Sequence, residues 1–298
     1  IVKGEGVASV EQGDVNYGTK PDPKAETSTN TEKTAVIEYK EASSDDTAYS
    51  QTVPTAVGNY TVRATFAETE AYGEAVATTD FSIRYLETPE PPYTLVGTKG
   101  ENGYYTSNVV VKPAKGYMIS TELNGTYVES LTIQNSQSGT VFYLRNASGE
   151  RTGALRLETI KIKKQTPKLS LENGKTYYGD SQKLVIQDDY LSQVYVNGVL
   201  QNLDGTEFVL QLGSNNGKKK YEITAVDVAG NKKTILVTVA AAWMKTGIIP
   251  EGVLVNLETG NGYKLGNGNW KVAGDSTSYS GGTEFYVKKD GSYTFGKQ

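Results

Sequence analysis

Two adjacent acid pairs, Asp45-Asp46 and Asp188-Asp189, are the first residues in this chain that could take part in acid–base chemistry. A glycoside hydrolase needs two carboxyl groups about 5–10 Å apart across a cleft. Neighbouring side chains of a strand point to opposite faces, so neither pair can act in this way unless it lies in a loop. The chain also has no His and no Cys, which excludes Ser-His-Asp and Cys-His nucleophiles, the usual zinc sites and disulfides. We therefore expect no enzymatic activity, with no catalytic, cofactor-binding or metal-binding residue.

Two other segments contain parts of phosphate-binding or ion-binding motifs. Gly174-Lys175-Thr176 has the end of a P-loop, but Leu169 stands where that motif needs its first Gly. Residues 14–18 have the first half of an EF-hand ligand series, without the third acid or the closing Glu. Both segments are therefore expected to be turns. A structural cation near Asp188, Asp189 and Asp227 is an open alternative.

The last part of the chain has the strongest candidates for ligand binding. Both Trp residues lie there, among Tyr residues, Gly-rich turns and polar side chains. Aromatic faces beside amide and carboxylate groups suit sugar rings, because C–H groups stack on the ring while hydroxyls bond to the polar groups. The candidate ligand-binding residues are Trp243, Trp270, Tyr263, Tyr279 and Asp275. The alternative is that these aromatics fill the core of a small β module, which has a poor ratio of surface to volume.

Composition indicates what kind of element must position these residues. The chain has 298 residues, 37% of them hydrophobic, with 32 Gly and 21 Tyr. This composition suits many short, half-buried strands joined by Gly turns, and it predicts an all-β protein. The net charge is 30 − 34 = −4, without a basic run, so we expect no nucleic-acid partner. No apolar stretch is long enough for a membrane span, so we expect no membrane insertion in this segment.

Strand-like alternation recurs along the chain. Tyr60, Val62, Ala64 and Phe66 fall on one face of a predicted strand, and Tyr221, Ile223 and Ala225 repeat the Tyr, aliphatic, Ala order. The segment 140–146 is predicted to be the equivalent strand of a third module. By contrast, residues 67–77 lack an apolar stripe and contain Gly73, which predicts a loop with at most one helical turn.

Proline-containing segments after the predicted last strands indicate boundaries at residues 87–92 and 163–167. A third boundary is expected at residues 240–243. The predicted units are residues 1–88, 89–165, 166–241 and 242–298, the last a small aromatic-rich β module. The chain begins at Ile1 without Met or a leader, so we expect it to be a processed part of a longer protein.

Turn residues predict three hairpins or strand connections in more detail. Asn197-Gly198 between apolar residues predicts a type I′ hairpin over residues 191–200. Asp227 and Gly230 predict a capped turn between the last two strands of the third unit. The segments 284–287 and 292–295, with Asp290-Gly291 between them, predict a C-terminal hairpin in which Phe285 and Phe295 belong to the core.

Several of these residues resemble known modules. Residues 15–19, 36–39 and 54–62 are similar to bacterial Ig-like modules of the MBG/YDG type, although Tyr17-Gly18 lacks the Asp that usually stands between these two residues. Residues 173–180 and 227–231 resemble Ig-like modules of Gram-positive cell-surface proteins. The resemblance implies tandem Ig-like β-sandwiches and carries no catalytic residue.

The same resemblance implies a non-catalytic stalk or adhesion segment outside the cell, secreted or wall-anchored, in a Gram-positive-type bacterium. Its partners would be a host or cell-wall glycan or a protein ligand, and we expect a monomer. The alternative is a carbohydrate-binding accessory region of a larger secreted enzyme, with glycan contact through the C-terminal unit. Such modules also sometimes carry a Lys–Asn isopeptide bond, for which Lys183 and Asn231 are residues of the required types.

Overall fold

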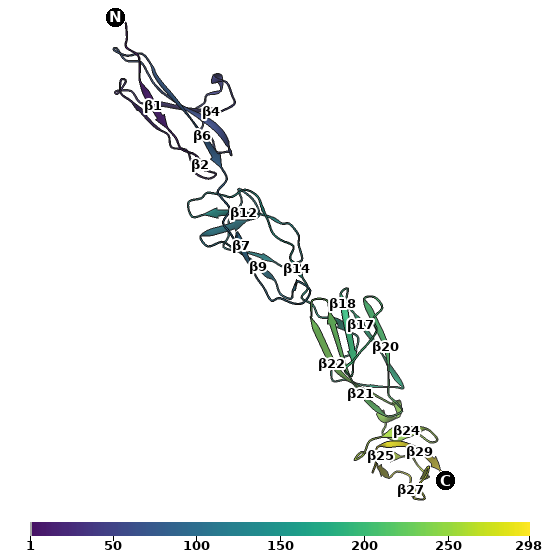
Figure 1. The fold of residues 1–298 in the computed structure, drawn as a ribbon. Helices are drawn as coiled ribbons and strands as arrows, with labels where there is room; N and C mark the ends of the chain where they lie inside the picture. Colours follow the sequence, from purple (N-terminus) through teal and green to yellow (C-terminus); the bar gives the residue numbers. More distant parts are fainter. Residues whose placement is uncertain (1) are drawn as a thin grey trace. The chain divides into compact units, whose positions relative to one another are not determined.

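The computed structural model describes residues 2–298, and regular structure in this range is almost entirely β (Figure 1). Its helical elements are the short 3-10 turns η1 (Asp46–Ala48) and η2 (Ala242–Lys245). No helix in the described range is long and apolar enough to cross a membrane. The chain forms two compact units: residues up to Thr98 with Ser107–Ile162, and Lys99–Thr106 with Lys163–Gln298.

The first sandwich of unit 1 begins with a segment that changes sheet. β1 (Ala8–Glu11) pairs antiparallel with β3 (Lys24–Thr27), whereas β2 (Val15–Asn16) pairs in parallel with β6 (Ala75–Arg84). β6 then pairs with β5 (Gly58–Phe66), and β5 with β4 (Val36–Glu41). Side chains from both sheets form the core, including Val10 from one sheet and Phe81 and Ile83 from the other.

The periodicity of β5 is confirmed, because Tyr60, Val62, Ala64 and Phe66 are all buried. The loop predicted over residues 67–77 is confirmed for residues 67–74, which form no helix, but residues 75–77 belong to β6 because they pair with the end of β5. Alternation with period two places every second side chain of β5 in the core.

The second sandwich lies in the same unit. One sheet has the order β11 (Leu131–Ile133), β9 (Val109–Pro113), β7 (Tyr93–Val96), and the other has β10 (Tyr117–Ser120), β12 (Val141–Asn146), β13 (Leu155–Arg156). Its fully buried side chains come from both sheets and include Val109, Val111, Ile119, Phe142 and Leu144. β14 (Lys161–Ile162) is the last strand of unit 1, and the short β8 (Tyr104–Tyr105) belongs to unit 2.

The third sandwich, in unit 2, repeats the strand arrangement of the first. β15 (Lys168–Leu169), β17 (Ser181–Gln187) and β20 (Glu207–Gly213) form one sheet, and β16 (Thr176–Tyr178) pairs in parallel with β22 (Lys232–Ala240). β22 is followed in the second sheet by β21 (Lys218–Asp227), β18 (Leu191–Val196) and β19 (Val199–Leu200). In both sandwiches the first segment changes sheet and then pairs in parallel with the last strand, as β2 does with β6 and β16 does with β22. The predicted fold class of tandem Ig-like β-sandwiches is confirmed.

The predicted turns of the third sandwich are confirmed. Asn197 and Gly198 have φ values of 49° and 77°, as a type I′ turn requires, and Val196 pairs with Val199. The Oδ1 of Asp227 accepts from the backbone N–H groups of Ala229 and Asn231, each at 2.9 Å, and Gly230 has a φ of 84°.

The C-terminal β module corrects one prediction. β28 (Glu284–Tyr286) pairs with β25 (Gly262–Leu265) in the sheet β23 (Ile248–Ile249), β25, β28. β29 (Gly291–Lys297) lies in a different sheet, with the order β24 (Leu254–Leu257), β29, β26 (Asn269–Val272), β27 (Ser278–Ser280). The predicted hairpin is therefore wrong. Phe285 and Phe295 are both in the core, as predicted, and pack edge to face with ring centroids 5.0 Å apart. They come from two different sheets that face each other across the core, not from neighbouring strands of one sheet.

Candidate functional site

Trp270 is a core residue of the C-terminal β module. It lies in β26, only 2% of its surface is exposed, and its Nε1–H donates to the Gly266 carbonyl at 2.7 Å. The Lys297 ammonium lies 5.5 Å from the ring centroid. A sugar ring could stack on Trp270 only if this core opened.

Trp243 and Tyr263 form an aromatic pair at the edge of the same core. Their ring centroids are 5.6 Å apart in an edge-to-face arrangement, and both side chains are half-buried. Burial raises the pKa of Tyr263 above its ordinary value. The Nε1–H of Trp243 is buried without a hydrogen-bond partner. An unpaired buried donor is unfavourable. Trp270 already uses its N–H, so Trp243 is the Trp side chain whose N–H could donate to a ligand oxygen or a water.

Asp275 lies in the turn between β26 and β27, and Tyr279 lies in β27 beside Trp270. Asp275 accepts from the Thr277 N–H at 2.9 Å and from the Tyr279 hydroxyl at 3.1 Å. The Thr277 hydrogen bonds lower the pKa of Asp275. Tyr279 is the register partner of Trp270 and packs edge to face on Phe285. The structure thus brings Trp270, Tyr279 and Asp275 together, with Trp243 and Tyr263 as a separate pair.

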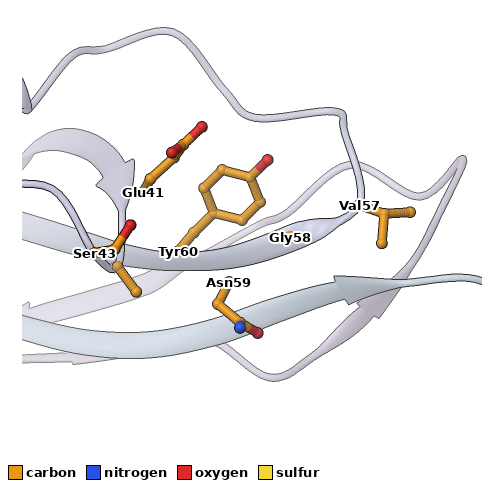
Figure 2. A pocket seen from close by; sticks show the side chains of 7 residues that line it. Glu41, Ser43, Val57, Gly58, Asn59 and Tyr60 are labelled. Atoms are coloured by element: carbon orange, nitrogen blue, oxygen red, sulfur yellow. The ribbon is translucent and has the colours of Figure 1, made fainter.

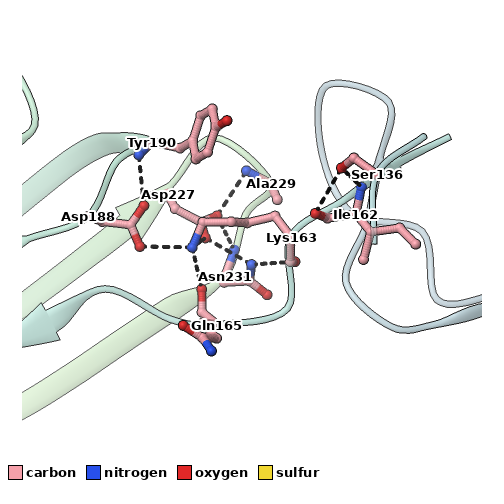
Figure 3. A network of polar contacts seen from close by, with 9 residues as sticks. All are labelled: Ser136, Ile162, Lys163, Gln165, Asp188, Tyr190, Asp227, Ala229 and Asn231. Carbon is pink, nitrogen blue, oxygen red and sulfur yellow. Dashed lines mark hydrogen bonds and ion pairs between the residues drawn. The ribbon is translucent and has the colours of Figure 1, made fainter. Parts of the chain in front are cut away.

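A buried polar network in unit 2 was not predicted from the sequence (Figure 3). The Lys163 ammonium lies 2.9 Å from Asp188 Oδ2 and 3.3 Å from Asp227 Oδ2, and it donates to the Gln165 carbonyl. Asn231 donates to the Lys163 carbonyl and to Asp227 Oδ2. Burial acts to lower the pKa of Lys163, but the hydrogen bonds and charges of Asp188 and Asp227 outweigh it, so this pKa is raised.

The network bears on two alternatives from the sequence. The Lys163 ammonium occupies the place beside Asp188 and Asp227 that the structural-cation alternative assigns to a metal ion. No cluster of metal-ligand residues is found in residues 2–298. The isopeptide alternative needs Lys183 and Asn231 to be in contact. Lys183 is exposed on β17, whereas Asn231 lies in the turn between β21 and β22 of the other sheet, so the two residues lie in different sheets. Asp188 and Asp227 could be identified from the sequence as candidate ion ligands. Their partner Lys163 lies 25 residues before Asp188 and has no motif that marks it.

The motif fragments are turns only in part: Val15–Asn16 is strand β2 and Thr176 begins β16, because each pairs with the last strand of its sandwich, while residues 17–18 and 173–174 form turns. Asp14 accepts from the Ser82 N–H at 2.7 Å and pairs with Arg84, so its carboxylate has partners within the sheet. Gly174 has a φ of 78°, and Lys175 pairs with Glu172 at 2.8 Å.

A shallow pocket of about 360 Å³ lies at the start of β5 in the first sandwich. Its lining consists of residues 41–43 and 57–60, and Figure 2 shows Tyr60 and Asn59 on opposite sides of the strand. Glu41 is its charged residue, and the Tyr60 hydroxyl donates to the Ala56 carbonyl at 3.0 Å. With one carboxylate and no second acid or base, this pocket offers no acid–base pair.

Comparisons with known proteins leave the function open. No family model matches the chain, and no curated protein matches it either. Among solved structures, the surface glycan-binding protein SGBP-B of the Bacteroides ovatus mixed-linkage glucan utilization locus, in complex with a heptasaccharide, shares 12% identity over 96% of this chain and 87% of its own, with a TM-score of 0.19.

The sialic acid binding region of a Streptococcus sanguinis adhesin shares 12% identity over 83% of this chain and 80% of its own, with a TM-score of 0.24. The insect immune protein hemolin shares 12% identity over 99% of this chain and 96% of its own, with a TM-score of 0.20. Scores this low carry no argument about function.

Proposed function

We propose that this chain is a non-catalytic extracellular stalk or adhesion segment of a bacterial cell-surface protein, of the Gram-positive type. Its four parts would be residues 1–88, 89–165, 166–241 and 242–298. The observation that carries the proposal is that sandwiches within each unit are joined by backbone hydrogen bonds. In unit 1, Arg151 N–H donates to the Tyr17 carbonyl and Leu86 N–H donates to the Arg151 carbonyl.

Unit 2 has a comparable connection. Asn256 N–H donates to the Asn216 carbonyl, and the side-chain amide of Asn256 donates to the Asn215 carbonyl. Joints bonded through the backbone resist bending more than a flexible linker does, which suits a spacer that presents a ligand-binding part away from its anchor. The absence of His and Cys from the sequence agrees with a role that needs no nucleophile.

Small-angle X-ray scattering of the whole chain tests the stalk. A single 298-residue globule would have a radius of gyration of about 19 Å. We expect a clearly larger value and an elongated distance distribution, and concentration-independent curves for a monomer. A radius near that of the globule would contradict the proposal.

The second candidate function is carbohydrate binding through the C-terminal β module, in an accessory region of a larger secreted enzyme. The unpaired indole N–H of Trp243 beside Tyr263 favours it. Glycan-array binding tests it with Trp243→Phe, which keeps a ring and removes the N–H. We expect this variant to lose about tenfold in affinity, the value of one hydrogen bond of about 1.4 kcal/mol. Tyr286→Phe is the control, because Tyr286 is 62% exposed on β28; equal binding by both variants and the wild type would argue against this candidate.

A further inference from the structure

Two arginines in unit 1, Arg145 and Arg151, lie side by side without a carboxylate partner. The ion pairs between residues 2 and 298 include Arg63 and Arg84 but neither of these two side chains. Arg145 is the residue before Asn146, the last residue of β12, and it forms an isolated antiparallel bridge with Arg151. Directly opposite residues of antiparallel strands share a face, so the two positive charges are close neighbours.

Both guanidinium groups lie close to the same aromatic ring. The guanidinium carbons of Arg145 and Arg151 are 4.8 and 5.9 Å from the ring centroid of Tyr127, which is 5% exposed. Arg151 is also 5.5 Å from the ring of Tyr17. The negative faces of these rings partly offset the repulsion between the two cations.

Most of the N–H donors of these two arginines are unused by the protein. A guanidinium has five N–H donors. Arg145 donates to the Met118 sulfur at 3.6 Å, a weak acceptor, and Arg151 Nη1 donates to Asn124 Oδ1 at 3.3 Å. The Nε–H of Arg151 is buried and has no hydrogen-bond partner. A buried charged donor that is unpaired indicates a missing acceptor.

The neighbouring carboxylate does not supply that acceptor. Glu150, which precedes Arg151, accepts instead from the side chains of Asn146, Asn16 and Thr19. The Asn146 hydrogen bond is the main cause of the lowered pKa of Glu150, which therefore stays ionised but directed to these partners. Positive charge thus remains in excess at the arginine pair.

Exposed ring surface lies beside the pair. Tyr17 is half-buried and packs at 5.7 Å between centroids against Tyr85, which is 43% exposed. Asn124 is exposed and binds both the Tyr17 hydroxyl and Arg151 through Oδ1. Ring faces suit the C–H surface of a sugar, and the amide suits its hydroxyls, which favours a sugar over an acidic peptide.

We propose that Arg145 and Arg151, with Tyr17, Tyr85 and Asn124, form a binding site for a glycan that bears a carboxylate or sulfate group. The anionic group lies at the two guanidinium forks, whose planar geometry matches oxyanions, and the sugar ring lies along the tyrosine faces. This inference deepens the proposed adhesive function and rests on it for its biological setting.

The test measures binding of the whole chain to three immobilised versions of one disaccharide: glucuronate-terminated, 6-sulfated and neutral. The wild type binds at least one anionic version about tenfold or more tightly than the neutral one, and the difference falls with added salt. Arg145→Gln removes this preference. Arg145→Lys, which keeps the charge and loses the fork, weakens binding several-fold. The two anionic versions distinguish a carboxylate ligand from a sulfate ligand.

Arg156→Gln is the matched control, since Arg156 is exposed in β13 and donates to the Gly139 carbonyl. It removes the same charge from the same sandwich and leaves binding unchanged. Thermal unfolding of each variant shows that it is folded, and Arg151→Gln provides a second variant at the site. The inference is overturned if the wild type shows no anion preference, if Arg156→Gln weakens binding as much as Arg145→Gln, or if a poly-glutamate peptide binds more tightly than the sugars. These outcomes leave the scattering test of the stalk unaffected.

Discussion

At the residue scale, Lys163 shows how a buried charge can act as a structural tie. Its side chain is 15% exposed, and those of Asp188 and Asp227 are 6% and 0% exposed. The Lys163 ammonium compensates for the hydration that the two carboxylates lose on burial. Removing it would leave two buried negative charges without a partner. Because Asn231 also bonds the Lys163 carbonyl, the segment that enters the third sandwich is attached to it by both its main chain and its side chain.

We predict that Lys163→Met lowers the free energy of unfolding of unit 2 by about 3 kcal/mol, because two carboxylates lose their partner. Urea unfolding followed by fluorescence measures the change. Lys183→Met removes the same charge from an exposed position on β17 and should change stability by about 0.5 kcal/mol or less. Equal effects of the two substitutions would show that the network is not a stabilising tie.

The raised pKa of Lys163 predicts a pH dependence with a definite sign. A group whose pKa is higher in the folded state stabilises the fold fully below its unfolded pKa, ordinarily 10.5 for Lys. This contribution is lost as the pH rises through the folded value. Wild-type unit 2 should therefore lose its stability advantage over Lys163→Met above about pH 10.5, as urea midpoints measured from pH 8 to pH 11 would show. An advantage that stays constant over this range would contradict the assignment.

At the scale of elements, a tyrosine near the start of a core strand recurs in two sandwiches. Tyr60 in β5 donates to the Ala56 carbonyl at 3.0 Å, and Tyr221 in β21 donates to the Gly213 carbonyl at 2.7 Å. Each ring belongs to the core while its hydroxyl bonds the chain that leads into the strand. This is the role of the tyrosine corner in Ig-like folds.

We predict that Tyr221→Phe destabilises unit 2 by about 1 kcal/mol, because the half-buried Gly213 carbonyl loses its donor while ring packing is retained. Differential scanning calorimetry would detect this as a lower melting temperature. Tyr178→Phe is the matched control, since Tyr178 is 50% exposed, and it should leave the temperature unchanged. An unchanged melting temperature of Tyr221→Phe would mean that the hydrogen bond of the Tyr221 hydroxyl does not stabilise the fold.

Other elements show which local patterns were sufficient for prediction. The period-two burial of β5 and the Asn197-Gly198 turn follow from backbone geometry over a few residues, and both were predicted correctly. The pairing of residues 284–287 with 292–295 was not, because β28 and β29 pair instead with strands that lie elsewhere in the module. A short Gly-containing linker is compatible with a hairpin and with a connection between two sheets, so it cannot distinguish them.

At the scale of the whole molecule, rigidity within each unit depends on a few close backbone contacts. In unit 2 a Cβ added at Gly217 would lie 2.2 Å from the Asn256 carbonyl oxygen. The contact is therefore possible only because the residue is Gly. The neighbouring Asn216 carbonyl accepts from the Asn256 N–H, so the turn that contains Gly217 bonds the third sandwich to the C-terminal β module.

We predict that Gly217→Ala loosens this joint without unfolding either part. Hydrogen exchange at the Asn256 amide, which bonds the Asn216 carbonyl, should become faster by an order of magnitude or more, and residues 241–247 should become more sensitive to protease. Gly213→Ala is the control, because the nearest atoms to its added Cβ are 4.0 Å away. Unchanged exchange in Gly217→Ala would show that the two parts are coupled by other contacts.

The sequence by itself determined the strand content, the buried faces of β5 and β21, the turns at Asn197-Gly198 and Asp227–Gly230, and the exclusion of His- and Cys-dependent chemistry. These properties depend on residue types and on spacing over a few residues. Only the tertiary structure decided that Trp270 is a core residue, that Lys163 joins Asp188 and Asp227, and that Arg145 and Arg151 share the ring of Tyr127 without an acid partner. Each of these depends on which strands become neighbours, and strand pairing between distant segments is determined by the packing of whole sheets.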